Sequence, residues 1–266
     1  ERQGFRYTVS YSDNGQGVLE TTEEEPLLIT NTAPRNGSLK IKKRVTVNGS
    51  NPTAETYSLV NGTYTFTVMK KGDAEFVPRT VELTINGNNI AESDEITDLP
   101  AGTYVITESS QTGTELIEAT VDNIPATITS QSVEVVVTAG KVSTEAPVVS
   151  FTNNATKIDF EKIWKYNNAS MKWADNTSIT VTVSGGNRRY IYTISRNDLV
   201  AGKEISGHAH AEGDPKLTVR TVHEDDRTET YEYKFEVREL PYNNGDPYIV
   251  TEQKVDKYKD PIYKDD

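Results

Sequence analysis

The stretch that decides the fold is "GSLKIKKRV", Gly37 to Val45, in which apolar and polar residues alternate. Successive side chains of a β-strand point to opposite faces of its sheet. One face of this strand therefore carries Leu39, Ile41, Lys43 and Val45. The pattern predicts a strand whose apolar face packs in a core and carries one amine, that of Lys43, into it.

Period-two alternation of this kind dominates the whole chain of 266 residues. Turn sequences such as "VNGT", "PAGT" and "NNGD" separate the alternating segments. No long segment has the 3.6-residue period of an amphipathic helix. The spacing of short strands favours sandwiches, so we predict an all-β fold of tandem immunoglobulin-like β-sandwiches. The clearest alternating segments are residues 63–69, 103–109, 132–139, 178–185, 189–195, 231–237 and 247–253.

The composition argues against several classes of function. The net charge is −12, whereas nucleic-acid binding needs clustered Lys and Arg, so no nucleic-acid partner is expected. No apolar run reaches the roughly 18 residues of a membrane span, so no membrane insertion is expected. There is no glycine-rich phosphate loop or nucleophile elbow, and His208 and His210 lack further ligands at zinc spacing. We therefore expect no cofactor, no metal site and no turnover enzyme.

The order of sequence motifs repeats along the chain. The first module, residues 34–155, carries "GSLKIKKRV" from Gly37 near its start and "LPAGTYVITE" late, and it closes with "VVSFTNN". Residues 156–266 begin with "TKIDFEKIW" and carry "LPYNNGDPYIVTE" late, but no closing strand follows. Residues 1–33 contain "FRYTVSYS" and "PLLITNT", which have the form of the missing part. We expect one complete module, one that lacks its last strand, and detached C-terminal strands of a module of the second type, cut out of phase from a tandem array.

Three apolar stripes of the first module each end in one polar residue. The stripe of "GSLKIKKRV" holds Lys43, the stripe of "TYVITE" ends at Glu108, and the stripe of "VVSFTNN" ends at Asn153. A lysine, a glutamate and an asparagine from three strands should therefore meet in the core. By the same parity, the second module supplies Lys162 and Glu252, and the detached strand supplies Asn31.

Burial of such a set has a chemical consequence. Burial lowers the pKa of a lysine and raises that of a carboxyl group, so the two can meet in neutral forms. A neutral amine is a nucleophile, and a protonated carboxyl group can hydrogen-bond the asparagine carbonyl, polarise it and shuttle a proton. The product would be a Lys–Asn amide, with release of ammonia.

The motif order, K-x-V or K-x-W, then LPxG with Y-x-V-T-E, then F-T-N, resembles the Cna protein B-type domains of Gram-positive surface adhesins and pilins. The resemblance covers nearly the whole chain, and "LPAGTYVITE" with "VSFTNN" carries it most specifically. It implies β-sandwiches that each form an autocatalytic intramolecular isopeptide bond between Lys and Asn, assisted by Glu. The matching positions are Lys43, Glu108 and Asn153 in the first module, and Lys162, Glu252 and Asn31 for the second.

Neighbouring residues offer alternatives to this assignment. Lys40 and Lys42 lie in the same strand but have outward parity, so Lys43 is preferred. Asn154 has the opposite parity to Asn153 and is set aside for the same reason. In the second module, Glu239 follows the 235–237 stripe and competes with Glu252. Glu252 is preferred because "YIVTE" follows the Pro/Gly turn, as the family pattern requires.

The position of the detached strand raises the question of its partner. If the modules lie end to end, the linker "TAPRNG" is too short to reach back past a whole sandwich. We therefore expect residues 1–33 to complete the second module of a neighbouring copy, head to tail. A fold-back within one chain, or a simple boundary of the segment, are the alternatives.

Taken with the resemblance, these features indicate a structural stalk segment of a longer, cell-wall-anchored surface protein outside a Gram-positive cell. Its chemistry would be a single turnover of bond formation, and its partners would be neighbouring modules or copies. The alternative is a ligand-binding adhesin module that recognises a host protein or glycan. A concave cluster of exposed aromatic residues, for example around Tyr166 and Trp173, would favour that alternative.

Overall fold

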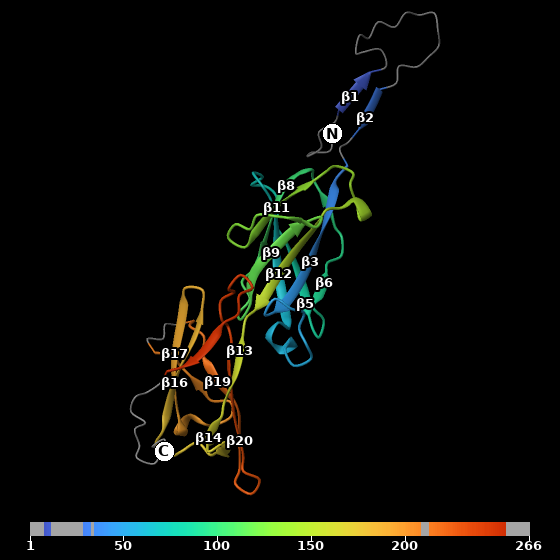
Figure 1. Ribbon diagram of the computed structural model, residues 1–266. Helices are drawn as coiled ribbons and strands as arrows, with labels where there is room; N and C mark the ends of the chain where they lie inside the picture. Colours follow the sequence, from blue (N-terminus) through green and yellow to red (C-terminus); the bar gives the residue numbers. More distant parts are fainter. Residues whose placement is uncertain (1–7, 12–28, 33–34, 209–212, 254–266) are drawn as a thin grey trace, which may run out of the picture.

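The computed structural model describes residues 8–11, 29–32, 35–208 and 213–253. Its regular structure is almost entirely β, which confirms the predicted all-β sandwich fold. Two sandwiches follow one another along the molecule, and a two-stranded ribbon lies beyond the first (Figure 1). All seven alternating segments form strands, whose ends shift by at most two residues. The short 3-10 turns are η1 (Tyr57–Leu59), η2 (Ser143–Glu145) and η3 (Arg196–Asp198).

The first sandwich consists of two sheets. One has the order β10-β9-β12-β3-β6, with β7 also paired to β3, and the other has the order β11-β8-β4-β5. Neighbours in these sheets are antiparallel except β12 and β3, which are parallel. The first sheet contains β3 (Gly37–Val47), β6 (Ile90–Glu92), β7 (Ile96–Leu99), β9 (Glu115–Val121), β10 (Ile124–Pro125) and β12 (Val148–Ala155). The second contains β4 (Gly62–Lys70), β5 (Arg79–Ile85), β8 (Gly102–Glu108) and β11 (Ser132–Val137).

The core of this sandwich consists of the predicted apolar stripes. Removing each large apolar side chain from water contributes about 1.5–3 kcal/mol, so the strands are held with these faces inward. Gly37 begins β3 because a Cβ there would lie 2.4 Å from the carbonyl oxygen of Thr138. The fully buried stripe residues are Leu39, Ile41, Lys43 and Val45 in β3, Tyr104 and Ile106 in β8, and Val149 and Phe151 in β12.

The second sandwich also has two main sheets, of orders β13-β20-β19-β18 and β17-β16-β21, with a β14-β15 hairpin beside them. Trp173 is at the centre of its core and contacts Trp164 and Tyr233 edge to face. The strands are β13 (Ile158–Lys162), β14 (Trp164–Tyr166), β15 (Ala169–Met171), β16 (Ser178–Gly185), β17 (Arg188–Ser195), β18 (Glu204–Ile205), β19 (Leu217–Asp225), β20 (Thr230–Val237) and β21 (Ile249–Glu252).

The ribbon consists of β1 (Thr8–Tyr11) and β2 (Ile29–Thr32), which pair antiparallel. Its register places Val9 opposite Asn31 and Tyr11 opposite Ile29. The side chain of Asn31, most of the expected 1–33 unit and the expected tail from residue 254 lie outside the described structure.

The junction between the sandwiches is short and hydrogen-bonded. Only Thr156 and Lys157 separate β12 from β13. The Asn154 side chain is buried here: its Oδ1 accepts from the Gly49 amide at 2.8 Å, and its Nδ2 donates to Thr156 Oγ1 at 2.8 Å. The Lys157 amide donates to Asn48 Oδ1 at 2.9 Å. These bonds attach the first residues of the second sandwich to the end of the first.

Candidate functional site

Lys43, Glu108 and Asn153 meet in the core of the first sandwich, on β3, β8 and β12. Lys43 Nζ donates to Glu108 Oε1 at 2.7 Å, and Asn153 Nδ2 donates to the same oxygen at 3.0 Å. The three residues are 0%, 1% and 3% exposed. One carboxyl oxygen therefore contacts both the amine and the amide nitrogen in the buried interior.

Burial shifts both titrating groups of this set toward their neutral forms. Desolvation lowers the pKa of Lys43 to about 8, although the neighbouring Glu108 opposes that shift. Desolvation likewise raises the pKa of Glu108, against the influence of Lys43 and Asn153. Because an isolated ion pair in such a place is costly, transfer of the proton from lysine to glutamate becomes accessible.

Two buried oxygens of the site lack a donor among the described residues. They are Glu108 Oε2 and Asn153 Oδ1. An unpaired buried acceptor costs roughly 1–3 kcal/mol. One hydrogen shared between these two oxygens would satisfy both. A proton on Glu108 would supply it. The sequence predicted a carboxyl group bonded to the asparagine carbonyl, whereas here the amide nitrogen faces it; rotation of the amide by half a turn exchanges the two.

Two further residues complete the surroundings, and sequence reasoning missed both. The ring centre of Tyr64 lies 4.5 Å from Lys43 Nζ. Thr114 Oγ1 accepts from Asn153 Nδ2 at 3.3 Å. Burial raises the pKa of Tyr64 to about 12, against a hydrogen bond with Thr114. Tyr64 follows the apolar parity of β4 and could have been found as a core residue; Thr114 lies in the loop before β9, and no sequence signal marks it.

The neighbouring alternatives do not contact the site. Lys40 and Lys42 lie on the other face of β3 and are only partly buried. Asn154 is buried, but its side chain bonds at the junction rather than to Lys43.

The second sandwich holds a similar pair at its edge. Lys162 Nζ donates to Glu252 Oε2 at 2.8 Å and lies 4.3 Å from the ring centre of Trp164. The side chains of the pair are 18% and 42% exposed. Within the described part of the chain, no asparagine hydrogen-bonds to either residue. Glu239 does not contact Lys162; it lies beyond β20 and faces Gly113 of the first sandwich.

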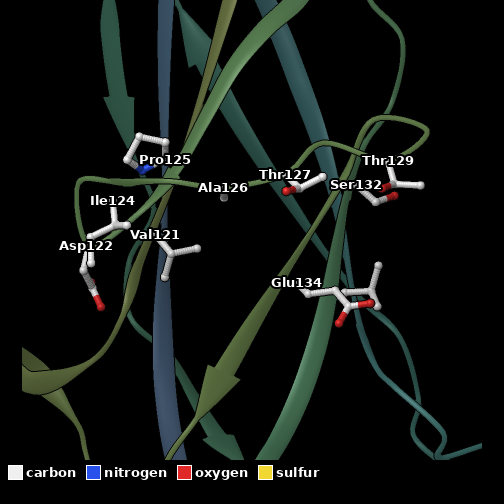
Figure 2. Close-up of a pocket in the computed structure, with 10 residues that line it drawn as sticks. Val121, Asp122, Ile124, Pro125, Ala126, Thr127, Thr129, Ser132 and Glu134 are labelled. Atoms are coloured by element: carbon white, nitrogen blue, oxygen red, sulfur yellow. The ribbon is translucent and has the colours of Figure 1, made fainter.

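A large hollow lies on the surface of the first sandwich. It measures about 800 Å³ and lies between the edge strands β10 and β11 (Figure 2). Val121, Ile124 and Pro125 line one side, and Glu134 lies on the other. Glu134 forms an ion pair with Lys71 at 2.6 Å. The hollow is open and mostly apolar, and it is separate from the Lys43 site.

Other candidate features give no site. Trp173 is a core residue, and Tyr166 lies apart from it on the surface, so the two form no exposed aromatic cluster. His208 shares a hydrogen bond of 2.6 Å with Thr193, while His210 lies outside the described residues. The described residues contain no group of three or more His, Cys, Asp or Glu arranged to hold a metal ion. They also contain no helix long and apolar enough to cross a membrane.

In the comparison with known proteins, a family model matches a segment that nearly coincides with the first sandwich. Residues 39–156 match the family described as "Domain of unknown function (DUF5979)". None of the curated proteins matches the chain in sequence. Among solved structures, the chain is similar to a DUF1812 protein of Bacteroides thetaiotaomicron VPI-5482 that is proposed to bind polysaccharide. The identity is 10% and the TM-score 0.32, over 75% of this chain and 71% of that one, and this likeness supports no functional argument.

Proposed function

We propose that the chain is a structural segment of an extracellular, cell-wall-anchored adhesin or pilin, whose first sandwich is closed by an amide bond between Lys43 and Asn153. The observation that carries the proposal is the single oxygen of Glu108 that contacts both reacting nitrogens in the core. The motif order that resembles the Cna protein B-type domains supports the same chemistry. No turnover enzyme is implied, because the protein itself is consumed in one reaction.

The bond would form in balanced steps. Glu108 takes a proton from Lys43, and the neutral Nζ attacks Cγ of Asn153. The carbonyl oxygen gains negative charge, which a protonated Glu108 stabilises. The Cγ–Nδ2 bond then breaks as Glu108 returns the proton to Nδ2, and the ionised Glu108 takes the remaining extra proton from Nζ and passes it to the departing ammonia, which leaves as ammonium. One N–C bond forms, one C–N bond breaks and one ammonia leaves, so no external reactant is needed.

The new bond would stabilise the sandwich against heat and force. Residues 43 and 153 lie 110 positions apart, and closure of a loop of about 100 residues is worth about 4–5 kcal/mol by the chain-entropy estimate for disulfides. The bond also joins the first strand, β3, to the last, β12. Tension applied at the two ends of the sandwich would pass through it rather than through the rest of the fold. Such resistance suits a stalk outside a cell.

A ligand-binding module is the second candidate function, and the hollow between β10 and β11 favours it. The hollow is large enough for a small ligand, and exposed Ile124 lies on its rim. A panel of host matrix proteins and glycans would test it with the chain and an Ile124→Asp variant. Loss of binding in the variant would support this role, and no binding by the wild-type chain would contradict it.

The intact mass of the purified chain tests the bond. We expect the mass to lie below that of the sequence by one ammonia, and Lys43→Ala to restore the full mass. Lys42→Ala, which changes the outward lysine of the same strand, is the matched control and should keep the deficit. A wild-type mass equal to that of the unmodified sequence would end the proposal.

A further inference from the structure

The reacting amide of Asn153 lies at an irregular point of its sheet. Strand β12 pairs with β9, and a bulge interrupts their register between Thr152 and Asn153. Beyond the bulge, Asn153 lies opposite Leu116 and Asn154 lies opposite Glu115. A bulge leaves one residue unpaired and changes the direction of the side chains beside it. The position of this amide therefore depends on neighbouring contacts as well as on the strand ladder.

One of these contacts comes from the loop that connects β8 to β9. The loop, residues 109–114, begins directly after Glu108 and ends with Thr114. The Thr114 hydroxyl donates to the Gln111 carbonyl at 3.4 Å, and its oxygen accepts from Asn153 Nδ2 at 3.3 Å. Donation to the loop leaves the lone pairs of the hydroxyl free to accept from the amide. The end of the loop therefore holds the nitrogen atom that leaves when the bond forms.

The residue after Thr114 contacts the second sandwich. Glu115 begins β9, and its Oε2 accepts from the backbone amide of Tyr242 at 2.8 Å. Tyr242 lies 127 positions further along the chain, in the connection from β20 to β21. Two consecutive residues therefore contact the reacting amide and the neighbouring module, respectively.

The segment around Tyr242 is in turn attached to its own sandwich. The Tyr242 carbonyl accepts from Arg188 Nη1 at 3.2 Å, and the Pro241 carbonyl accepts from the Tyr248 hydroxyl at 2.8 Å. Arg188 begins β17, and Tyr248 is buried in the second core. Because the amide donor is attached in this way, it fixes the Glu115 carboxylate only while the second sandwich is folded.

The neighbour of Asn153 in its own strand is also attached at the junction. Asn154 follows it in β12, and its side chain bonds to the Gly49 amide and to Thr156 Oγ1, both at 2.8 Å. The reacting amide therefore lies between two junction contacts, one through β9 and one through β12.

We propose that docking of the second sandwich positions the Asn153 amide for bond formation in the first, and that Glu115 is the positioning residue, acting through Thr114. The inference rests on the proposed function, because it concerns the rate of the same bond. Reaction rates depend steeply on the placement of the reacting groups, and a displacement of about 1 Å can cost about a hundredfold. The docked loop end holds the amide beside Glu108, whereas an undocked one would leave it more orientations.

This arrangement sets an order of events during assembly. The first sandwich precedes the second in the sequence, so its strands are synthesised and fold first. Its bond would form slowly until the second sandwich has folded and supplied the Tyr242 amide to Glu115. The crosslink would then fix β12 in the position that the finished junction requires.

The time course of the mass deficit from cell-free synthesis of the full chain tests this inference. Glu115→Ala should slow the loss of ammonia by roughly threefold to tenfold, as Thr114→Val does, because it acts through that residue. Glu115→Gln keeps an oxygen that accepts from the Tyr242 amide, so it should restore the rate. Glu118→Ala changes an exposed glutamate of the same strand; it is the matched control and should react at the wild-type rate.

A double-mutant cycle separates positioning from a general loss of stability. In a chain that already carries Thr114→Val, Glu115→Ala should change the rate by less than about twofold, because the residue through which it acts no longer holds the amide. Two independent structural losses would instead multiply. Multiplied effects, or a wild-type rate in Glu115→Ala alone, would overturn the inference.

The same contact can be removed from the side of the second sandwich. Tyr242→Pro lacks the backbone N–H and leaves Glu115 unchanged, so it should slow the bond by the same factor. In a chain that carries Glu115→Ala, it should have no further effect. A wild-type rate in Tyr242→Pro, or a slowing that multiplies with that of Glu115→Ala, would show that this contact does not position the amide.

Failure of this inference can be told from failure of the proposed function. Loss of ammonia at one rate in the wild type, Glu115→Ala and Tyr242→Pro would overturn the positioning role alone and leave the bond in place. A wild-type chain that never loses ammonia would overturn the bond, and the inference with it.

Discussion

The two sandwiches hold nearly the same lysine–glutamate contact, at 2.7 Å in the first and 2.8 Å in the second. In the first, both side chains are fully buried, whereas in the second they remain partly exposed to water. The difference lies in the neighbouring strand, because β12 covers Lys43 and no described strand covers Lys162 in that way. The closing strand β12 therefore has two effects: it brings the Asn153 amide to the lysine, and it shields the lysine–glutamate pair from solvent.

Substitution of the buried lysine should show the largest difference between the two sandwiches. Lys43→Ala abolishes the bond, and the loss of about 4–5 kcal/mol should lower the melting temperature by roughly 10–20 °C. Calorimetry of the dilute monomer measures it. Lys162→Ala, at an exposed pair, should change the same transition far less; equal effects of the two variants would contradict the comparison.

The next prediction concerns the acid of the buried pair. Glu108→Gln preserves the shape of the side chain but cannot carry the proton, so bond formation should slow by about 10²–10⁴-fold. The readout is the mass deficit followed over time from cell-free synthesis of the chain. Glu252→Gln should leave the deficit of the first sandwich unchanged. A full deficit in freshly synthesised Glu108→Gln would show that the carboxyl group is not needed.

The junction between the sandwiches gives a smaller effect. Asn154→Ala removes three hydrogen bonds and leaves the Gly49 amide and the Thr46 hydroxyl without this partner. The cost should be about 1–3 kcal/mol in denaturant unfolding. Asn51→Ala, which changes an exposed asparagine near the same end of the sandwich, should cost under about 0.5 kcal/mol. Equal costs would mean that the junction does not stabilise the molecule.

The rate of bond formation should depend on pH, because the reactive pair holds a single proton. The reactive form has a neutral Lys43 and a protonated Glu108, so the pair holds one proton between them. Because the pKa of Lys43 is lowered to about 8, the pair begins to lose that proton above about pH 8, and the rate should fall by up to about tenfold per pH unit. A rate that continues to rise through pH 10 would indicate that a free amine is sufficient.

The smallest effect is expected at Thr114. Thr114→Val removes the acceptor that orients the Asn153 amide, and one such hydrogen bond is worth about 0.5–1.5 kcal/mol. The rate of bond formation should therefore fall by roughly threefold to tenfold, while the final mass deficit stays complete. Thr114→Ser, which keeps the hydroxyl, should restore the rate. If Ser and Val behave alike, Thr114 only fills space.

Much of the fold and the first site could be predicted because a period-two pattern is local. Lys43 and Glu108 each continue an apolar stripe, so their burial follows from parity alone. Strand β19 escaped prediction because a bulge between Val219 and Thr221 breaks its alternation.

Other features depend on contacts between distant segments, which no local pattern records. Thr114 joins the site through the path of a loop. Asn154 has the outward parity that normally means exposure, yet it is buried because the second sandwich begins beside it. The partial exposure of Lys162 likewise depends on which strands surround β13, not on the sequence of β13 itself.

The two-residue connection from β12 to β13 affects how stiff an array of such modules would be. With Asn48 and Asn154 bonded across it, this point is a poor hinge, and the second sandwich should keep a fixed direction relative to the first. An array built with such connections would behave as a straight rod, each added unit extending it by a constant step. The end-to-end length of such an array would then be set by the number of its units.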